Sequence, residues 1–144
     1  MSDVLLPVVD EVSQPFWDGA LAGELRVQRC GGCDRLRFPP RPMCPWCQST
    51  DAGWNAMSGR GTIYSFVVAH PPLLPAFAAV APYNVALVAL DEDPTIRMVG
   101  NVVAAAGDPI NSIDPATLQI GDPVQAVFDR VTDDVALLRW VRPL

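Results

Sequence analysis

Residues 30–47 read CGGCDRLRFPPRPMCPWC, which is two Cys-x-x-Cys pairs separated by ten residues. Two residues between the thiols let each pair turn back on one ion, and two pairs supply the four soft ligands of a closed tetrahedral site. Gly31 and Gly32 ease the tight backbone of the first pair, and residues 35–42 can form the hairpin that returns the second pair. The spacing predicts a zinc ribbon with one structural ion, held by Cys30, Cys33, Cys44 and Cys47.

Other uses of these cysteines fit the sequence less well. A redox pair is expected for one isolated Cys-x-x-Cys motif beside a βαβ pattern, and neither condition holds here. No basic residue precedes Arg26, so no secretory signal is indicated and a cytoplasmic location with reduced thiols is expected. Iron in a site of four thiolates uses the same spacing, so the spacing alone leaves iron open. Because the protein supplies all four ligands, no open position remains for water or substrate.

On the N-terminal side of the ribbon, one short amphipathic helix is expected. Ser13 is the expected N-cap, Pro15 suits the first turn, and Gly23 is placed to end the helix. Apolar residues recur between them at helical spacing. Leu25 to Arg29 then reads as a brief strand that enters the ribbon.

On the C-terminal side, a turn-rich stretch is expected up to Gly61. Beyond it, the spacing of apolar residues changes to the one typical of β-strands. Five segments rich in Val, Ile and aromatic residues are separated by turns containing Pro, Gly and Asp. They are residues 62–69, 83–90, 95–103, 124–130 and 135–141. Without a long helical pattern between them, these segments predict a small closed barrel. An OB-fold is the preferred five-stranded solution, and an SH3-like barrel is the competitor.

The expected fold class is therefore mainly β, divided into three parts. A short N-terminal helical segment occupies residues 1–24, the zinc ribbon residues 25–58, and a five-stranded OB-fold barrel residues 59–144.

Composition and charge exclude several classes of function. Half of the 144 residues are apolar and 18% are charged, which is typical of a folded chain. The net charge is −6, and all ten basic residues are Arg. Affinity for DNA or RNA comes largely from neutralising phosphates, so no nucleic-acid partner is expected. The most apolar stretch, residues 76–90, is interrupted by Pro82 and is too short to span a bilayer, so no membrane partner is expected either.

The basic residues are concentrated around the cysteines. Residues 25–60 carry six Arg against two Asp, whereas the segments on either side are acidic. A guanidinium patch there suits a phosphate or a carboxylate. A solvated or internally paired face is the alternative. The candidate anion ligands are Arg35, Arg37, Arg41 and Arg60.

Two apolar features are hard to bury in a domain of this size. The first is the aromatic pair on the N-terminal helix, and the second is the loop 71–77. Exposed aromatic and Leu side chains are typical of partner interfaces, and packing over the barrel end is the alternative. The candidate interface residues are Phe16, Trp17, Leu73, Leu74 and Phe77.

No catalytic residue can be assigned from the sequence. His70 is the only histidine, and neither a Gly-x-Ser-x-Gly elbow nor a cysteine outside the ribbon accompanies it. An independent hydrolase is therefore the least favoured function, and no activity is expected from this chain alone.

The order of parts closely resembles an acyl-CoA-associated OB-fold family with a rubredoxin-like zinc ribbon, catalogued as domain of unknown function 35. The resemblance covers residues 13–142 and combines the Phe-Trp helix, the ribbon and three later segments. These segments are Gly61-Thr-Ile-Tyr-Ser-Phe66, Pro82-Tyr-Asn-Val-Ala-Leu-Val88 and Ile120-Gly-Asp-Pro-Val124. Among functional residues, the four cysteines match the family pattern.

This resemblance implies a non-catalytic accessory subunit in lipid metabolism. Family members pair with thiolase-like (sterol-carrier-type) enzymes, or with MaoC-type enoyl-CoA hydratases, that act on acyl-CoA thioesters. In actinobacterial steroid degradation the thiolase-like partner is a retro-aldolase that shortens the sterol side chain. No MaoC-like region is attached here, which favours a heteromeric complex with a thiolase-like aldolase or thiolase. The arginines of the middle segment would then help to hold the CoA phosphates of an acyl-CoA shared with the partner.

The main alternative of another class is an OB-fold protein that binds single-stranded nucleic acid. Such a protein needs a basic groove with exposed stacking aromatics. The strand region here has four Arg against nine acids, which disfavours that function.

Overall fold

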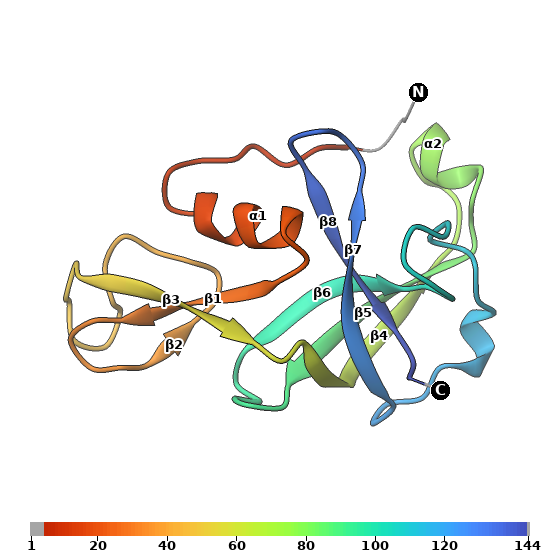
Figure 1. Ribbon diagram of the computed structural model, residues 1–144. Coiled ribbons are helices and arrows are strands. Elements are labelled where there is room, and N and C mark those ends of the chain that lie inside the picture. Colours follow the sequence, from red (N-terminus) through yellow and green to blue (C-terminus); the bar gives the residue numbers. More distant parts are fainter. Residues whose placement is uncertain (1–4, 144) are drawn as a thin grey trace.

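An eight-residue helix, α1 (Gln14–Leu21), lies over the junction between a three-stranded sheet and a five-stranded barrel (Figure 1). This computed structural model describes residues 5–143, so residues 1–4 of the predicted segment 1–24 and residue 144 of the predicted barrel segment lie outside the described residues. The predicted fold class is confirmed: a short N-terminal helix, a zinc ribbon and a closed five-stranded OB-fold barrel.

The two ends of α1 are built differently. Ser13 is the N-cap residue, but its hydroxyl makes no capping bond and instead donates to Asp10 Oδ1 at 2.7 Å. The Ser13 N–H donates to the same oxygen, and the two bonds lower the pKa of Asp10. At the other end Gly23 has φ +76°, and the Glu24 N–H donates to Gly19 O at 2.8 Å. Gly23 therefore ends the helix in a left-handed turn, as predicted.

The ribbon contains three antiparallel strands in the order β2-β1-β3. They are β1 (Leu25–Cys30), β2 (Leu36–Arg37) and β3 (Ala52–Met57). Strand β3 was not expected, because its sequence AGWNAM is rich in residues with low β-propensity. It forms because all six of its residues pair with β1, from Leu25↔Met57 to Cys30↔Ala52. Pairing with β1 thus outweighs the low intrinsic β-propensity of this segment.

The barrel closes in the order β4-β5-β6-β8-β7, with β7 returning to β4. Its strands are β4 (Arg60–Ala69), β5 (Tyr83–Leu90), β6 (Arg97–Val102), β7 (Pro123–Arg130) and β8 (Ala136–Val141). All neighbours are antiparallel except β6 and β8, which are parallel and pair only at Asn101↔Arg139 and Val102↔Trp140. The barrel is thus closed between β6 and β8 by these two pairs alone.

Only short helices join the barrel strands. α2 (Pro75–Ala78) follows β4, and the 3-10 turn η1 (Pro115–Thr117) precedes β7. Within residues 5–143, no helix is long and apolar enough to cross a membrane.

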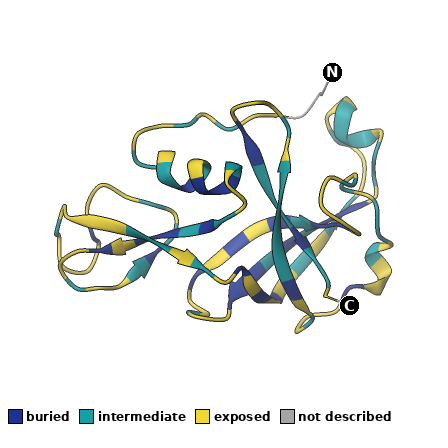
Figure 2. Cartoon of the chain, in the orientation of Figure 1, coloured by how far each residue is buried: buried dark blue, intermediate teal, exposed yellow. Residues whose placement is uncertain are grey.

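A single apolar core runs from the helix through the first ribbon strand into the barrel (Figure 2). It joins Phe16 of α1 and Val27 of β1 to Trp140, Ile63 and Met98 of the barrel. The division into residues 1–24, 25–58 and 59–144 stays a prediction, and this shared core places parts of all three segments in one packing unit.

Candidate metal centre and surrounding surfaces

The four ribbon cysteines bring their thiols together at the end of the β1–β2–β3 sheet. All four Sγ atoms lie within 4.8 Å of one another. Cys30 and Cys47 are 3.5 Å apart at sulfur, and Cys33 and Cys44 are 3.7 Å apart. A tetrahedron with Zn–S bonds of about 2.3 Å has edges of about 3.8 Å. The four cysteines are therefore positioned to bind one metal ion, and they leave no position for a substrate.

The backbone around the two Cys-x-x-Cys pairs is the same. In the first pair the Asp34 N–H donates to Cys30 O, and in the second the Gln48 N–H donates to Cys44 O, at 3.1 and 3.0 Å. Asp34 and Gln48 both have positive φ, 63° and 59°. Each turn then presents two sulfurs to the same point. Sequence reasoning missed Asp34 and Gln48, for which the only signal was that each directly follows the second cysteine of its pair.

Close packing at the first turn requires Gly32. A Cβ built at Gly32 would lie 2.9 Å from the Ser49 side chain and 3.2 Å from Cys47 Sγ. A side chain there would separate the two turns that supply the ligands.

Hydrogen bonds and neighbouring sulfurs shift the pKa values of the Cys30 and Cys47 thiols in opposite directions. The Cys33 and Gly32 N–H groups donate to Cys30 Sγ and lower the pKa of that thiol to about 6. The Ser49 N–H also favours the thiolate of Cys47, but the neighbouring Cys30 sulfur and burial outweigh it and raise the pKa of Cys47 to about 11. A metal ion binds cysteines as thiolates, so a bound cation favours the deprotonated form of all four groups.

A buried polar network attaches the second half of the ribbon to β1. The Gln28 carboxamide accepts from Arg37 Nε at 2.7 Å and from the Arg41 N–H at 2.8 Å. Gln28 Nε2 and Arg37 Nη2 both donate to Arg41 O. This network fixes the chain between β2 and Cys44, so it positions the second pair of ligands.

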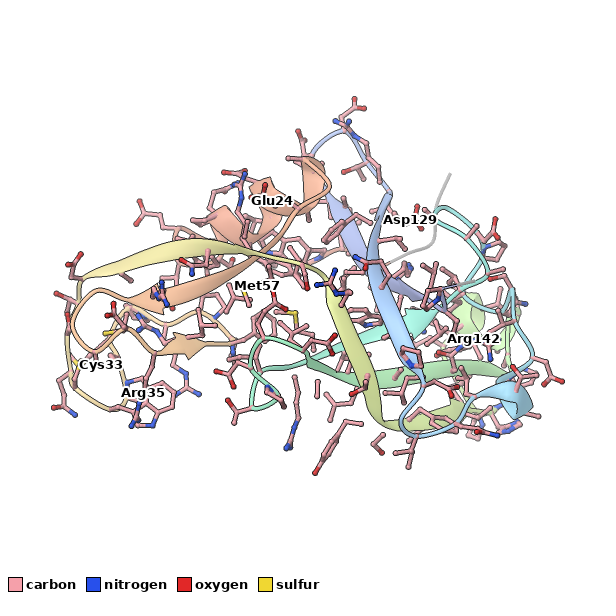
Figure 3. All side chains as sticks on the ribbon, turned by 60° about the horizontal axis from the view of Figure 1, so that its bottom comes forward. Glu24, Cys33, Arg35, Met57, Asp129 and Arg142 are labelled. Atoms are coloured by element: carbon pink, nitrogen blue, oxygen red, sulfur yellow. The ribbon has the colours of Figure 1, made fainter. Side chains whose placement is uncertain are left out.

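The structure separates the four candidate arginines. Arg35 and Arg41 are exposed on the ribbon, and Figure 3 shows Arg35 beside Cys33 at its outer end. Arg37 is only 3% exposed and is engaged in the network above, which argues against its role as an anion ligand. Arg60 is exposed at the start of β4 in the barrel. Anion binding by Arg35, Arg41 and Arg60 stays a prediction.

The candidate interface residues also differ in exposure. Phe16 is 7% exposed and packs against Trp17 of the same helix and Phe38 of the ribbon. Trp17, Leu73 and Phe77 are half-buried, and of the five candidates only Leu74 is exposed, at 61%. Other exposed apolar side chains were not singled out from the sequence, because single exposed positions carry no periodic signal. They include Met43 and Trp46 on the ribbon, and Tyr64, Val67, Val99 and Ile120 on the barrel.

Comparison with known proteins assigns both halves of the chain. Residues 17–51 match the family "ChsH2, rubredoxin-like zinc ribbon domain", and residues 54–129 match "ChsH2, C-terminal OB-fold domain". The structure is similar to a chain of the "Ltp2-ChsH2(DUF35) aldolase", with a TM-score of 0.81 and 34% identity over 96% of this chain and 100% of that one.

Two relatives show the range of proteins in which these domains occur. The first is the 3-oxo-4,17-pregnadiene-20-carboxyl-CoA hydratase alpha subunit of Mycobacterium tuberculosis, 41% identical over 78% of this chain and 32% of its own length. This chain thus spans about a third of the hydratase subunits it matches. The second is a DUF35 domain-containing scaffold protein of Methanocaldococcus jannaschii, 33% identical over 74% of this chain and 68% of its own length.

Proposed function

Because the chain belongs to the ChsH2 (DUF35) family of zinc-ribbon and OB-fold proteins, we propose that it is a non-catalytic accessory subunit of a thiolase-like acyl-CoA enzyme. The observation that carries this proposal is the similarity to the DUF35 chain of an aldolase, which extends over 96% of this chain. The chemistry, cleavage or formation of a carbon–carbon bond beside a thioester, belongs to the partner. The role of this chain is to bind and order that partner.

The outer end of the ribbon has the side chains expected of a partner interface. Trp46 is 51% exposed, and the Arg35 guanidinium lies 5.0 Å from the centre of its ring. Met43 is exposed nearby in sequence. Trp, Arg and Met are enriched at protein interfaces, and a metal-held loop presents them with little loss of conformational entropy on binding. We assign these three residues to the interface, together with Leu74.

The exposed arginines extend this proposal to the substrate. Arg35 and Arg41 flank the interface on the ribbon, and neither forms a salt bridge within residues 5–143. Free guanidinium groups beside an interface suit the phosphates of a CoA molecule bound mainly by the partner. The name of the Mycobacterium tuberculosis relative includes a steroid carboxyl-CoA, and a steroid acyl-CoA is the substrate class that we favour.

A MaoC-type hydratase is the second candidate partner. Two relatives that are 40% and 41% identical to this chain are named as hydratase alpha subunits, the first as a probable enoyl-CoA hydratase and the second as a steroid carboxyl-CoA hydratase. The two candidates predict different chemistry, hydration in one case and carbon–carbon bond cleavage in the other.

Co-expression separates the two candidates. The chain is produced with a thiolase-like enzyme or with a MaoC-like hydratase from the same genome, and complex formation and acyl-CoA turnover are measured. We expect a stable complex and higher activity with the thiolase-like enzyme. A thiolase-like enzyme that is fully soluble and active without this chain would overturn the proposal. Trp46→Ala should weaken the complex, whereas Ile120→Ala, which removes another exposed apolar side chain on the barrel, should not.

A further inference from the structure

A large open cleft lies on the outside of the barrel where β6 and β8 diverge. Its volume is about 660 Å³, within the range of small-molecule sites. The floor is formed by Val99 of β6 and Leu138 of β8, and one wall by Phe16 and Trp17 of α1. Phe38 of the ribbon completes that wall. The cleft therefore joins all three parts of the fold.

The charged residues of this cleft are of one sign. Among the side chains that line it, only Arg97 and Arg139 carry a charge, although the chain as a whole has a net charge of −6. Arg97 lies with its guanidinium 3.8 Å from the centre of the Tyr64 ring. Nearby carboxylates lie behind the lining: Asp10 accepts from the cleft residue Ser13, and Asp108 and Asp129 line an adjoining hollow that shares Arg139. An apolar cleft whose own charged side chains are both arginines is complementary to an amphiphilic anion.

Arg139 is incompletely paired for a side chain that is only 11% exposed. Its Nη2 lies 3.8 Å from Asp129 Oδ2, at the outer limit of an ion pair, and its Nη1 donates to Asn101 Oδ1 at 3.3 Å. Its buried Nε has no partner among the described residues. Burial lowers the pKa of Arg139, and the Asp129 charge only partly opposes that effect. A second anion near Nη1 and Nη2 would compensate this cation.

We propose that this cleft binds an amphiphilic carboxylate, whose apolar body contacts Trp17 and Val99 and whose carboxylate bonds to the Arg139 guanidinium. The inference goes beyond the proposed function, because it gives the chain a small ligand of its own. A fatty acid and a steroid carboxylate both have this chemistry, so both are used as probes.

Isothermal titration calorimetry on the full chain tests the site. Decanoate and cholate are the probes, each below its critical micelle concentration. Decanol tests the need for the charge, and CoA alone tests binding by phosphates without an apolar body. We expect one saturable site for at least one carboxylate, affinity for decanol at least about tenfold weaker than for decanoate, and no binding of CoA in the cleft. If neither carboxylate binds, or if decanol binds as well as decanoate, the proposal is wrong.

Two valines provide a matched pair of variants. Val99 of β6 lines the cleft and Val67 of β4 does not, yet the side chain of each is 61% exposed on the outer surface of the barrel. Val99→Asp should weaken carboxylate binding at least about tenfold by adding a negative charge beside the ligand, and Val67→Asp should leave it unchanged. Equal effects of the two variants would contradict the proposal.

Arg139→Met tests the cation directly. This variant should bind decanoate and decanol with similar affinity, because the apolar body of each ligand is still accommodated. Retention of the full preference for decanoate would exclude Arg139 as the anion ligand. Because no partner is present, these results do not depend on whether the chain supports a thiolase-like enzyme.

Discussion

The ribbon and the barrel of this chain are stabilised by different means. From Arg41 to Gly53 in the ribbon, only Cys44 and Ser49 are not exposed to solvent. In β5 of the barrel, six of the eight residues are buried. The barrel can fold by burying apolar surface, whereas the outer ribbon must rely on four thiolates and a few polar bonds. A protein that presents a loop to a partner gains from this division, because the exposed loop stays ordered without a core of its own.

Among the changes considered, loss of the metal should destabilise the structure most, and the loss of structure should be confined to the ribbon. Cys44→Ser removes one of four ligands, and structural zinc contributes about 10–16 kcal/mol in small zinc-binding peptides. We expect zinc content to fall from one ion per chain to none. The amides of Asp34 and Gln48, bonded within the two cysteine turns, should lose protection from hydrogen exchange.

The barrel gives the internal reference for that experiment. Amides of β5 and β6 should keep their protection in Cys44→Ser, and Met43→Ser, an exposed neighbour that is not a ligand, should keep its zinc. Equal loss of protection in both regions would mean that the ribbon and the barrel unfold together.

Trp140 tests the other half of the comparison. It is the largest fully buried side chain of the described residues, so Trp140→Ala should lower the free energy of unfolding by about 3–5 kcal/mol. Trp46→Ala removes the same side chain from the exposed ribbon end and should cost less than about 0.5 kcal/mol. Urea denaturation with zinc present measures both. Similar losses for the two variants would show that Trp46 is packed in solution.

The two regions also differ in how far the sequence predicted them. The cysteine spacing and the five Val-rich and Ile-rich segments predicted the ribbon and the barrel, because ligand spacing and strand period are local signals. Strand β3 could not be predicted, because AGWNAM becomes a strand only by pairing with β1. The same holds for Arg37, which reads as a surface cation until Gln28 and the carbonyl of Arg41 enclose it. Phe16 belongs to this group as well, since only the tertiary fold places Phe38 against it.

The polar network of the ribbon should contribute less than the metal but a measurable amount. Gln28→Ala removes the acceptor of Arg37 Nε and leaves that buried guanidinium with one bond, to Arg41 O. Leaving such a group unsatisfied costs about 1–3 kcal/mol. The control is Gln125→Ala, in which a half-buried Gln loses one bond to Ser58 O and no buried charge is left unpaired. Chemical denaturation should show a smaller loss for the control. A lower zinc affinity in Gln28→Ala alone would support the role of the network in positioning Cys44.

The smallest change in the free energy of unfolding is expected for Glu92, which bonds to Ser58 where the ribbon meets the barrel. Glu92, in the turn between β5 and β6, accepts bonds from the Ser58 N–H at 2.7 Å and the Ser58 hydroxyl at 2.9 Å. Desolvation raises the pKa of Glu92, but these bonds outweigh it and hold the pKa below its usual value of 4.5. A lowered pKa in the folded state stabilises the fold above pH 4.5, and the contribution is lost as the pH falls through the folded-state pKa.

Glu92→Gln should therefore destabilise the chain at pH 7 by about 0.5 kcal/mol, a low value because the carboxylate is exposed and its charge is screened by solvent. Below the folded-state pKa both chains are neutral at residue 92, so their urea midpoints should converge. Asp91→Asn, an exposed neighbour in the same turn, controls for the change in net charge. A difference between Glu92→Gln and the natural chain that persists at low pH would show that Glu92 joins the ribbon to the barrel through its shape and not through its charge.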